Sequence, residues 1–142
     1  MAIRVLLADD HSDFRSSVRR LLENTSEFDV VAEAASGVEA VQLARKHLPD
    51  VVVLDVRMKG MTGIAATSCI LADCPRTAIL MVSICGEKQY VVRSVEAGAR
   101  GYLLKDTVHE ELFKAIRAVY QGGCFFCSQI QPFAKLALGS ES

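Results

Sequence analysis

The sequence of 142 residues contains no apolar run that approaches the roughly 20 residues needed to cross a bilayer. Its formal net charge is −1, so it lacks the basic excess that marks non-specific nucleic-acid binding. The first residues enter a strand-like stretch directly, without signal-peptide organisation. No glycine-rich dinucleotide or P-loop motif follows that stretch, which excludes the common nucleotide-binding domains. These absences predict a cytoplasmic chain with no membrane partner.

The cysteines are also too few and too scattered for a secreted disulfide scaffold. There are five, an odd number, at positions 69, 74, 85, 124 and 127. We interpret them as reduced thiols that mostly fill apolar space. Cys124 and Cys127 form a CxxC, but no second CxxC or histidine pair accompanies it, so a metal or redox role is not favoured.

What the chain does contain is a regular alternation of short apolar runs and amphipathic helical patterns, within the length of one domain. Strands are predicted over 3–8, 28–35, 51–54, 77–82 and 99–104. Helices are predicted over 14–22, from 36 to before Pro49, and over 64–71, 87–96 and 107–120, with capping boxes at 36–39 and 107–110. This pattern predicts an α/β, flavodoxin-like (βα)5 three-layer fold with a parallel five-stranded sheet. The order 2-1-3-4-5 is taken from known folds of this type.

Polar residues follow four of the predicted strands. Asp9 and Asp10 follow the first, Asp55 the third, Ser83 the fourth and Lys105 the fifth. In an open α/β sheet ligands bind at this edge, where the strand order reverses. Three carboxylates that meet there would repel one another, and Mg²⁺, which prefers oxygen ligands, relieves that repulsion. Lysine and serine can contact a phosphate, and aspartate can act as a nucleophile, so the set fits phosphoryl transfer.

Taken together, these motifs resemble a response-regulator receiver domain over residues 2 to about 121. The matching segments are Ala8–His11, Val53–Met58, Gly60–Met61 with Gly63, Leu80–Ser83 and Gly101–Asp106. The stretch 96–105, with 115–119 and 122–123, resembles the NarL (LuxR-type) subfamily in particular. Two positions depart from the family pattern: Lys59 stands where proline is common, and Thr62 where aspartate is common.

The resemblance implies a role for each site residue. Asp55 would be the phosphoacceptor, and Mg²⁺ would be held by Asp9, Asp10, Asp55 and the backbone carbonyl of Arg57. Lys105 would contact the phosphoryl oxygens, Ser83 would shift toward the phosphate, and Tyr102 would swing inward when Ser83 moves.

It also implies a function. A partner histidine kinase would phosphorylate Asp55 and so switch an output surface or a C-terminal helix-turn-helix transcription domain, with a homodimer possible on phosphorylation. The chain would not be an enzyme beyond a weak autophosphatase activity. DNA would be bound only through a domain that this chain does not contain. We assign 1–121 to the receiver domain and 122–142 to a linker or tail, with a short helix or linker at 128–138 and a disordered end at 139–142.

Alternatives remain at this stage. The chain can be a stand-alone receiver that acts by protein–protein interaction, or a receiver fold that is never phosphorylated. A phosphatase with an aspartyl-phosphate intermediate would carry two aspartates two residues apart, and Arg57 argues against it. Asp9 and Asp10 can simply cap a helix. His11 borders the acidic residues and can tune them, and Arg15 belongs to a solvated helix face or a partner surface.

Overall fold

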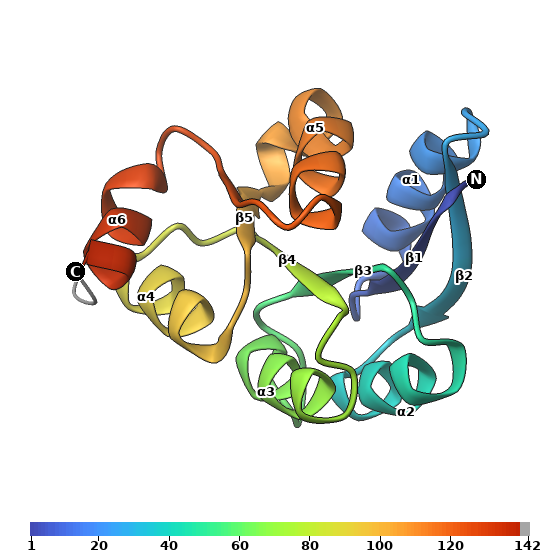
Figure 1. Cartoon of the computed structure of the whole chain (residues 1–142), viewed down its shortest axis with the longest axis horizontal. Helices are drawn as coiled ribbons and strands as arrows, with labels where there is room; N and C mark the ends of the chain where they lie inside the picture. The colour runs from blue at the N-terminus through green and yellow to red at the C-terminus, as the bar shows by residue number, and fades with distance from the viewer. Residues whose placement is uncertain (140–142) are drawn as a thin grey trace.

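The computed structural model describes residues 1–139, and its central feature is one parallel sheet with helices on both faces (Figure 1). The strands are β1 (Ile3–Ala8), β2 (Phe28–Ala34), β3 (Val51–Asp55), β4 (Ala78–Ser83), β5 (Gly101–Leu104) and β6 (Phe125–Phe126). The helices are α1 (Ser12–Glu23), α2 (Gly37–His47), α3 (Gly63–Asp73), α4 (Lys88–Ala97), the 3-10 helix η1 (Lys105–Thr107), α5 (Val108–Tyr120) and α6 (Gln131–Gly139).

The layers follow from right-handed crossovers between the strands. Helices α1 and α5 cover one face of the sheet, and α2, α3 and α4 cover the other (Figure 1). The strand order is β2-β1-β3-β4-β5-β6, and every neighbouring pair is parallel. The predicted fold and the predicted order of the first five strands are therefore confirmed.

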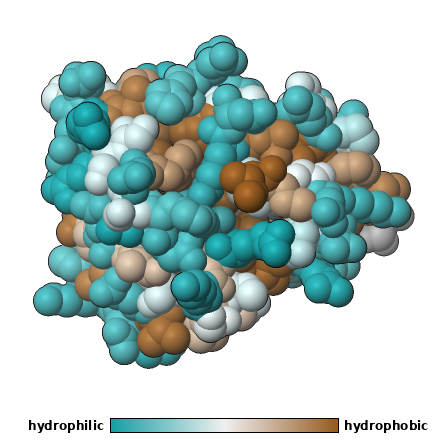
Figure 2. All heavy atoms as spheres, turned by 180° about the vertical axis from the view of Figure 1, so that it is seen from behind, coloured by the Kyte–Doolittle hydropathy of each residue, from teal (hydrophilic) through white to brown (hydrophobic). Residues whose placement is uncertain are grey.

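The core lies around the central strands because these are the most apolar segments of the chain. Every residue of β3 and β4 is buried, as expected for strands with helices on both faces. Outside the core, Figure 2 shows hydrophilic residues around several smaller hydrophobic areas of one face. Within residues 1–139, no helix combines the length and apolar composition needed to span a membrane.

The prediction of five strands is wrong by one, because β6 adds a short edge strand. Phe125 and Phe126 pair with Gly101 and Tyr102 of β5, and the Phe125 N–H donates to the Arg100 carbonyl at 3.0 Å. A two-residue strand is too short to show alternation, so no periodic pattern signals it. The two CxxC cysteines flank β6 as free thiols, and burial raises the pKa of Cys127, which disfavours a reactive thiolate.

Helix α6, which falls in the segment predicted as a helix or linker, packs beside α4 at the β5–β6 edge of the sheet (Figure 1). Ile130, which precedes it, and Ala134 and Ala137 within it are buried. The sequence predicts a disordered end at 139–142. Gly139 is instead the last residue of α6, and 140–142 lie outside the described residues.

The two predicted capping boxes differ in outcome. Ser36 Oγ accepts the Glu39 N–H at 3.2 Å, and Glu39 Oε1 accepts the Ala35 N–H at 2.6 Å, which confirms the first box. The second is wrong. Thr107 closes η1 with φ −106° and ψ −1°, and its hydroxyl donates to the Leu104 carbonyl at 3.0 Å and so caps no helix N–H.

We expect Ser36→Ala to lower the free energy of unfolding by about 1 kcal/mol, because it leaves the first turn of α2 without its side-chain acceptor. Urea unfolding measures the change. Ser68→Ala is the matched control, since Ser68 is exposed in the interior of α3, and its effect should lie within about 0.5 kcal/mol. Equal losses in the two variants would contradict the capping role.

Candidate functional site

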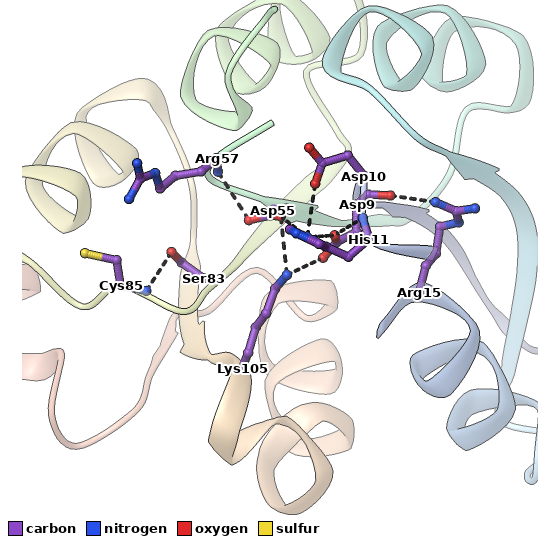
Figure 3. A network of polar contacts seen from close by, with 9 residues as sticks. All are labelled: Asp9, Asp10, His11, Arg15, Asp55, Arg57, Ser83, Cys85 and Lys105. Atoms are coloured by element: carbon purple, nitrogen blue, oxygen red, sulfur yellow. Dashed lines mark hydrogen bonds and ion pairs between the residues drawn. The ribbon is translucent and has the colours of Figure 1, made fainter. Parts of the chain in front are cut away.

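The parallel register brings the carboxyl ends of four strands to one edge of the sheet. Ala8 of β1 pairs with Leu54 of β3, Asp55 with Val82 of β4, and Ser83 with Leu104 of β5. The residues that follow these positions therefore meet. Figure 3 shows them together: Asp9, Asp10, Asp55, Ser83 and Lys105.

Asp55 lies at the centre and is almost enclosed, with 4% of its surface exposed. Its Oδ1 accepts the Arg57 N–H at 3.2 Å, which fixes the start of the loop after β3. The next turn of that loop closes tightly: the Gly63 N–H donates to the Val56 carbonyl at 2.9 Å. A Cβ on Gly63 would overlap the backbone carbonyl of Asp55, so only glycine permits this approach.

Lys105 supplies the positive charge of the site. Its Nζ lies 2.8 Å from Asp9 Oδ2 and 3.4 Å from Asp55 Oδ2. The ammonium also lies 4.4 Å from the centre of the Phe14 ring, a cation–π distance. The Phe14 ring and the carboxylates of Asp9 and Asp55 together hold the ammonium between the ends of β1 and β3.

The carboxylates nevertheless outnumber the lysine. Burial, followed by the charge of Asp9, raises the pKa of Asp55 from its ordinary 3.8 to about 6, although Lys105 and the Arg57 N–H favour the ionised form. The site as it stands therefore has an unbalanced negative charge at neutral pH.

This imbalance fits a divalent cation. Asp9 Oδ2 and Asp10 Oδ1 are buried and accept no hydrogen bond within the described residues, although Lys105 lies close to the first and His11 to the second. Carboxylate oxygens without hydrogen-bond donors are ligands suited to Mg²⁺. Asp9, Asp10 and Asp55 are thus placed to share an ion, whereas the role of the Arg57 carbonyl stays a prediction.

The two predicted switch residues lie on the other side of Asp55, and both bond to the backbone of Cys85. Ser83 Oγ accepts the Cys85 N–H at 3.0 Å and is directed toward Cys85 in Figure 3. The Tyr102 hydroxyl donates to the Cys85 carbonyl at 2.6 Å, and burial raises the pKa of Tyr102 to about 12. The family resemblance implies a ring that moves inward on activation, whereas here the ring is already fully buried.

Sequence reasoning missed one positioning residue. Arg15 was interpreted as part of a solvated helix face or a partner surface, but its Nη1 donates to the Asp9 carbonyl at 2.6 Å. Its Nε donates to Glu33 of β2 at 2.9 Å, and Glu33 also pairs with Arg19. No local signal announces this contact, because Glu33 lies 18 positions from Arg15. His11 does border the carboxylates, as expected, with Nδ1 3.2 Å from Asp9 Oδ1.

Fold and site together define a flavodoxin-like domain with an acidic pocket, of the receiver type. The sequence model of the response regulator receiver domain matches residues 5–117, and the chain belongs to that family. It is a receiver domain of the NarL/LuxR type found in two-component response regulators.

Known relatives agree with this assignment. The chain is 37% identical over 123 residues to the transcriptional regulatory protein DegU of Brevibacillus brevis, covering 87% of this chain and 52% of that protein. It is 40% identical over 121 residues to the oxygen regulatory protein NreC of Staphylococcus epidermidis, covering 84% and 56%. The chain therefore spans about half the length of the curated relatives it matches.

Two solved structures are similar over most of the fold. A LuxR-family two-component response regulator from Aurantimonas superposes with a TM-score of 0.89 at 34% identity, covering 98% of this chain and 99% of that one. The signal receiver domain of a putative response regulator NarL from Mycobacterium tuberculosis has a TM-score of 0.81 at 38% identity, covering 85% and 98%. The first likeness extends through the C-terminal segment that carries β6 and α6.

The raised pKa of Asp55 predicts a pH-dependent stability in metal-free buffer. Neutral Asp55 is favoured in the folded state, so its contribution is fully present below about pH 3.8 and is lost as the pH rises through about 6. Asp55→Asn should therefore unfold less readily at pH 7.5 by on the order of 2 kcal/mol, and this gain should vanish near pH 4.

Thermal and urea unfolding at both pH values, with a chelator present, measure the difference. Asp106→Asn is the matched control, since Asp106 is an exposed aspartate next to Lys105. A gain that stays constant from pH 4 to 7.5, or that appears equally in the control, would contradict the electrostatic account.

Proposed function

We propose that this chain is the phosphoacceptor input module of a response regulator, in which Asp55 takes a phosphoryl group from a partner histidine kinase in the cytoplasm. The observation that carries this proposal is the buried carboxylate of Asp55, which lies 3.4 Å from the Lys105 ammonium among unbalanced acids. An Asp55 oxygen would attack phosphorus, the P–N bond to the kinase histidine would break, and an acyl phosphate would remain on Asp55.

The step would use Mg²⁺, which Asp9, Asp10, Asp55 and the Arg57 carbonyl would hold. When bound, it would neutralise charge on the transferred group. The chain's own residues do the rest. Ionised Asp55 is the nucleophile, and Lys105 provides a second positive charge within reach of the new phosphoryl oxygens. Slow hydrolysis of the acyl phosphate would be the weak autophosphatase activity.

The readout would begin at Ser83. A phosphoryl group on Asp55 offers strong acceptor oxygens, and the Ser83 hydroxyl would turn to donate to one of them. That movement removes the acceptor of the Cys85 N–H, and the Cys85 carbonyl holds Tyr102. The neighbouring Gly86 lies close to the residue that precedes α6: a Cβ there would lie 3.0 Å from Ile130 Cδ1. These contacts support a path from Asp55 to α6.

The output would be transcriptional. DegU and NreC are named as regulatory proteins, and this chain matches about half of each. We infer that 1–121 is the receiver domain, that the segment from 122 including α6 leads to the missing part, and that a helix-turn-helix domain there binds DNA. Homodimerisation on phosphorylation, expected from the subfamily resemblance, belongs to the same proposal.

The first test is chemical. Incubation with a small phosphodonor such as acetyl phosphate and Mg²⁺ should add one phosphoryl group, detected by intact mass spectrometry. Asp55→Asn should abolish the addition, because the nucleophile is gone, and Asp106→Asn should leave it unchanged. An unmodified wild-type chain, or a phosphorylated Asp55→Asn chain, would sink the proposal.

The second test concerns the readout. Phosphorylation should raise hydrogen–deuterium exchange in α6, since the loop at Cys85 and Gly86 must rearrange when Ser83 turns away. Ser83→Ala should still accept the phosphoryl group but show no such increase, whereas the exposed control Ser68→Ala should behave as wild type. If α6 exchanges equally before and after phosphorylation, or if Ser83→Ala responds normally, the proposed path is wrong.

A further inference from the structure

His11 places an imidazole nitrogen among the three carboxylates. It is the N-cap residue of α1, yet its side chain makes no capping hydrogen bond. Instead Nδ1 lies 3.2 Å from Asp9 Oδ1, 3.1 Å from Asp10 Oδ1 and 4.0 Å from Asp55 Oδ2. In Figure 3 the ring lies over the carboxylates, on the side away from the Lys105 stem.

These separations are those of donor atoms around one ion. With metal–ligand bonds of about 2.1 Å, neighbouring ligands of an octahedron lie about 3.0 Å apart and opposite ones about 4.2 Å apart. In a tetrahedral site with bonds of about 2.0 Å, ligands lie about 3.3 Å apart. One ligand atom from each of Asp9, Asp10, His11 and Asp55 lies within 4.8 Å of every other.

Burial and charge give a second, independent indication of a ligand. The Asp9 side chain is only 6% exposed, and among the described residues its Oδ2 has the Lys105 ammonium, 2.8 Å away, as its partner and no other hydrogen-bond donor. Asp10 Oδ1 is buried, and among the described residues it faces the His11 nitrogen at 3.1 Å and accepts no hydrogen bond of normal geometry. Three carboxylates face a single lysine, so a bound dication would improve the charge balance.

The two kinds of donor in this cluster suit different cations. Mg²⁺ takes oxygen ligands and seldom recruits nitrogen. Imidazole suits Zn²⁺, Ni²⁺ and Cu²⁺, which also accept carboxylate oxygen. The His11 side chain is 68% exposed at the rim, so it can turn away when Mg²⁺ binds and keep its nitrogen among the carboxylates for another ion.

We propose that His11 Nδ1 is an additional ligand when the acidic pocket binds a borderline divalent cation such as Ni²⁺ or Zn²⁺, and that it contributes nothing to the binding of Mg²⁺. The inference rests on the cation site of the proposed function, because it uses the same carboxylates. Its consequence is that such cations compete with Mg²⁺ more strongly than an all-oxygen pocket would allow.

Titration calorimetry of the full chain with NiCl2 and, separately, with MgCl2 tests the proposal. His11→Ala should weaken Ni²⁺ binding by roughly tenfold or more and change Mg²⁺ binding by less than about twofold. Co²⁺ provides a spectroscopic readout: its visible absorption bands should shift between wild type and His11→Ala, because a nitrogen ligand is lost.

Two controls locate the ion. His109→Ala removes an exposed histidine outside the pocket and should leave the binding of both cations unchanged. Asp10→Asn removes a pocket carboxylate and should weaken both. Unchanged Ni²⁺ affinity in His11→Ala, equal losses for Ni²⁺ and Mg²⁺, or Ni²⁺ binding that survives Asp10→Asn would each overturn the proposal.

The phosphorylation assay separates this inference from the proposed function. The wild-type chain tests the proposed function by itself, since with acetyl phosphate and Mg²⁺ it should gain one phosphoryl group whatever the role of His11. If calorimetry fails while phosphorylation succeeds, only the nitrogen ligand is wrong. If wild type itself is not phosphorylated, the proposed function fails whatever Ni²⁺ does.

Discussion

Repulsion among three carboxylates at one edge of the sheet is the constraint around which this domain is built. Asp9, Asp10 and Asp55 would separate if their strands allowed it, because burial leaves little water to screen their charges. They cannot separate, since Asp9 follows β1 and Asp55 ends β3, and both strands are fixed in the fully packed interior of the sheet. The hydrophobic core therefore supplies the free energy that keeps the charges together.

The surrounding contacts offset part of this repulsion and fix the positions of the carboxylates. Lys105 offsets part of the charge from one side, and Arg15 holds the Asp9 backbone from another while it is itself held by Glu33. Gly63 allows the loop after β3 to close against the Asp55 carbonyl, and its N–H stabilises that closure by donating to the Val56 carbonyl. What remains negative is a small, preformed set of oxygens, which is the condition under which a dication is bound with little rearrangement.

The success of sequence reasoning depended on how local each signal is. The β-branched run at 51–53 and the capping box at Ser36 act over a few residues, so strands, helices and the meeting of strand ends were predictable. Three other features depend on residues that are distant in sequence, so no local pattern predicts them. They are the pairing of Phe125 with β5, the contact of Arg15 with Glu33 and the burial of Tyr102. At Thr107 a complete local motif gave a wrong prediction. The sequence there has the capping-box pattern, but in the tight turn of η1 after β5 the hydroxyl donates to the Leu104 carbonyl and caps no helix.

The position of Ser83 shows how a small site can act at a distance. Its hydroxyl is the acceptor of the Cys85 N–H, and removing an acceptor from a buried or half-buried donor costs about 1–3 kcal/mol. Any event that draws this hydroxyl elsewhere must therefore be followed by movement of the Cys85 peptide. The carbonyl of the same residue, in the next peptide unit, accepts the Tyr102 hydroxyl, and Gly86 follows it with Ile130 and Leu104 packed nearby. Because packed groups shift between discrete arrangements rather than deform gradually, the proposed path needs a change of only one hydrogen bond at β4 to bias the docking of α6.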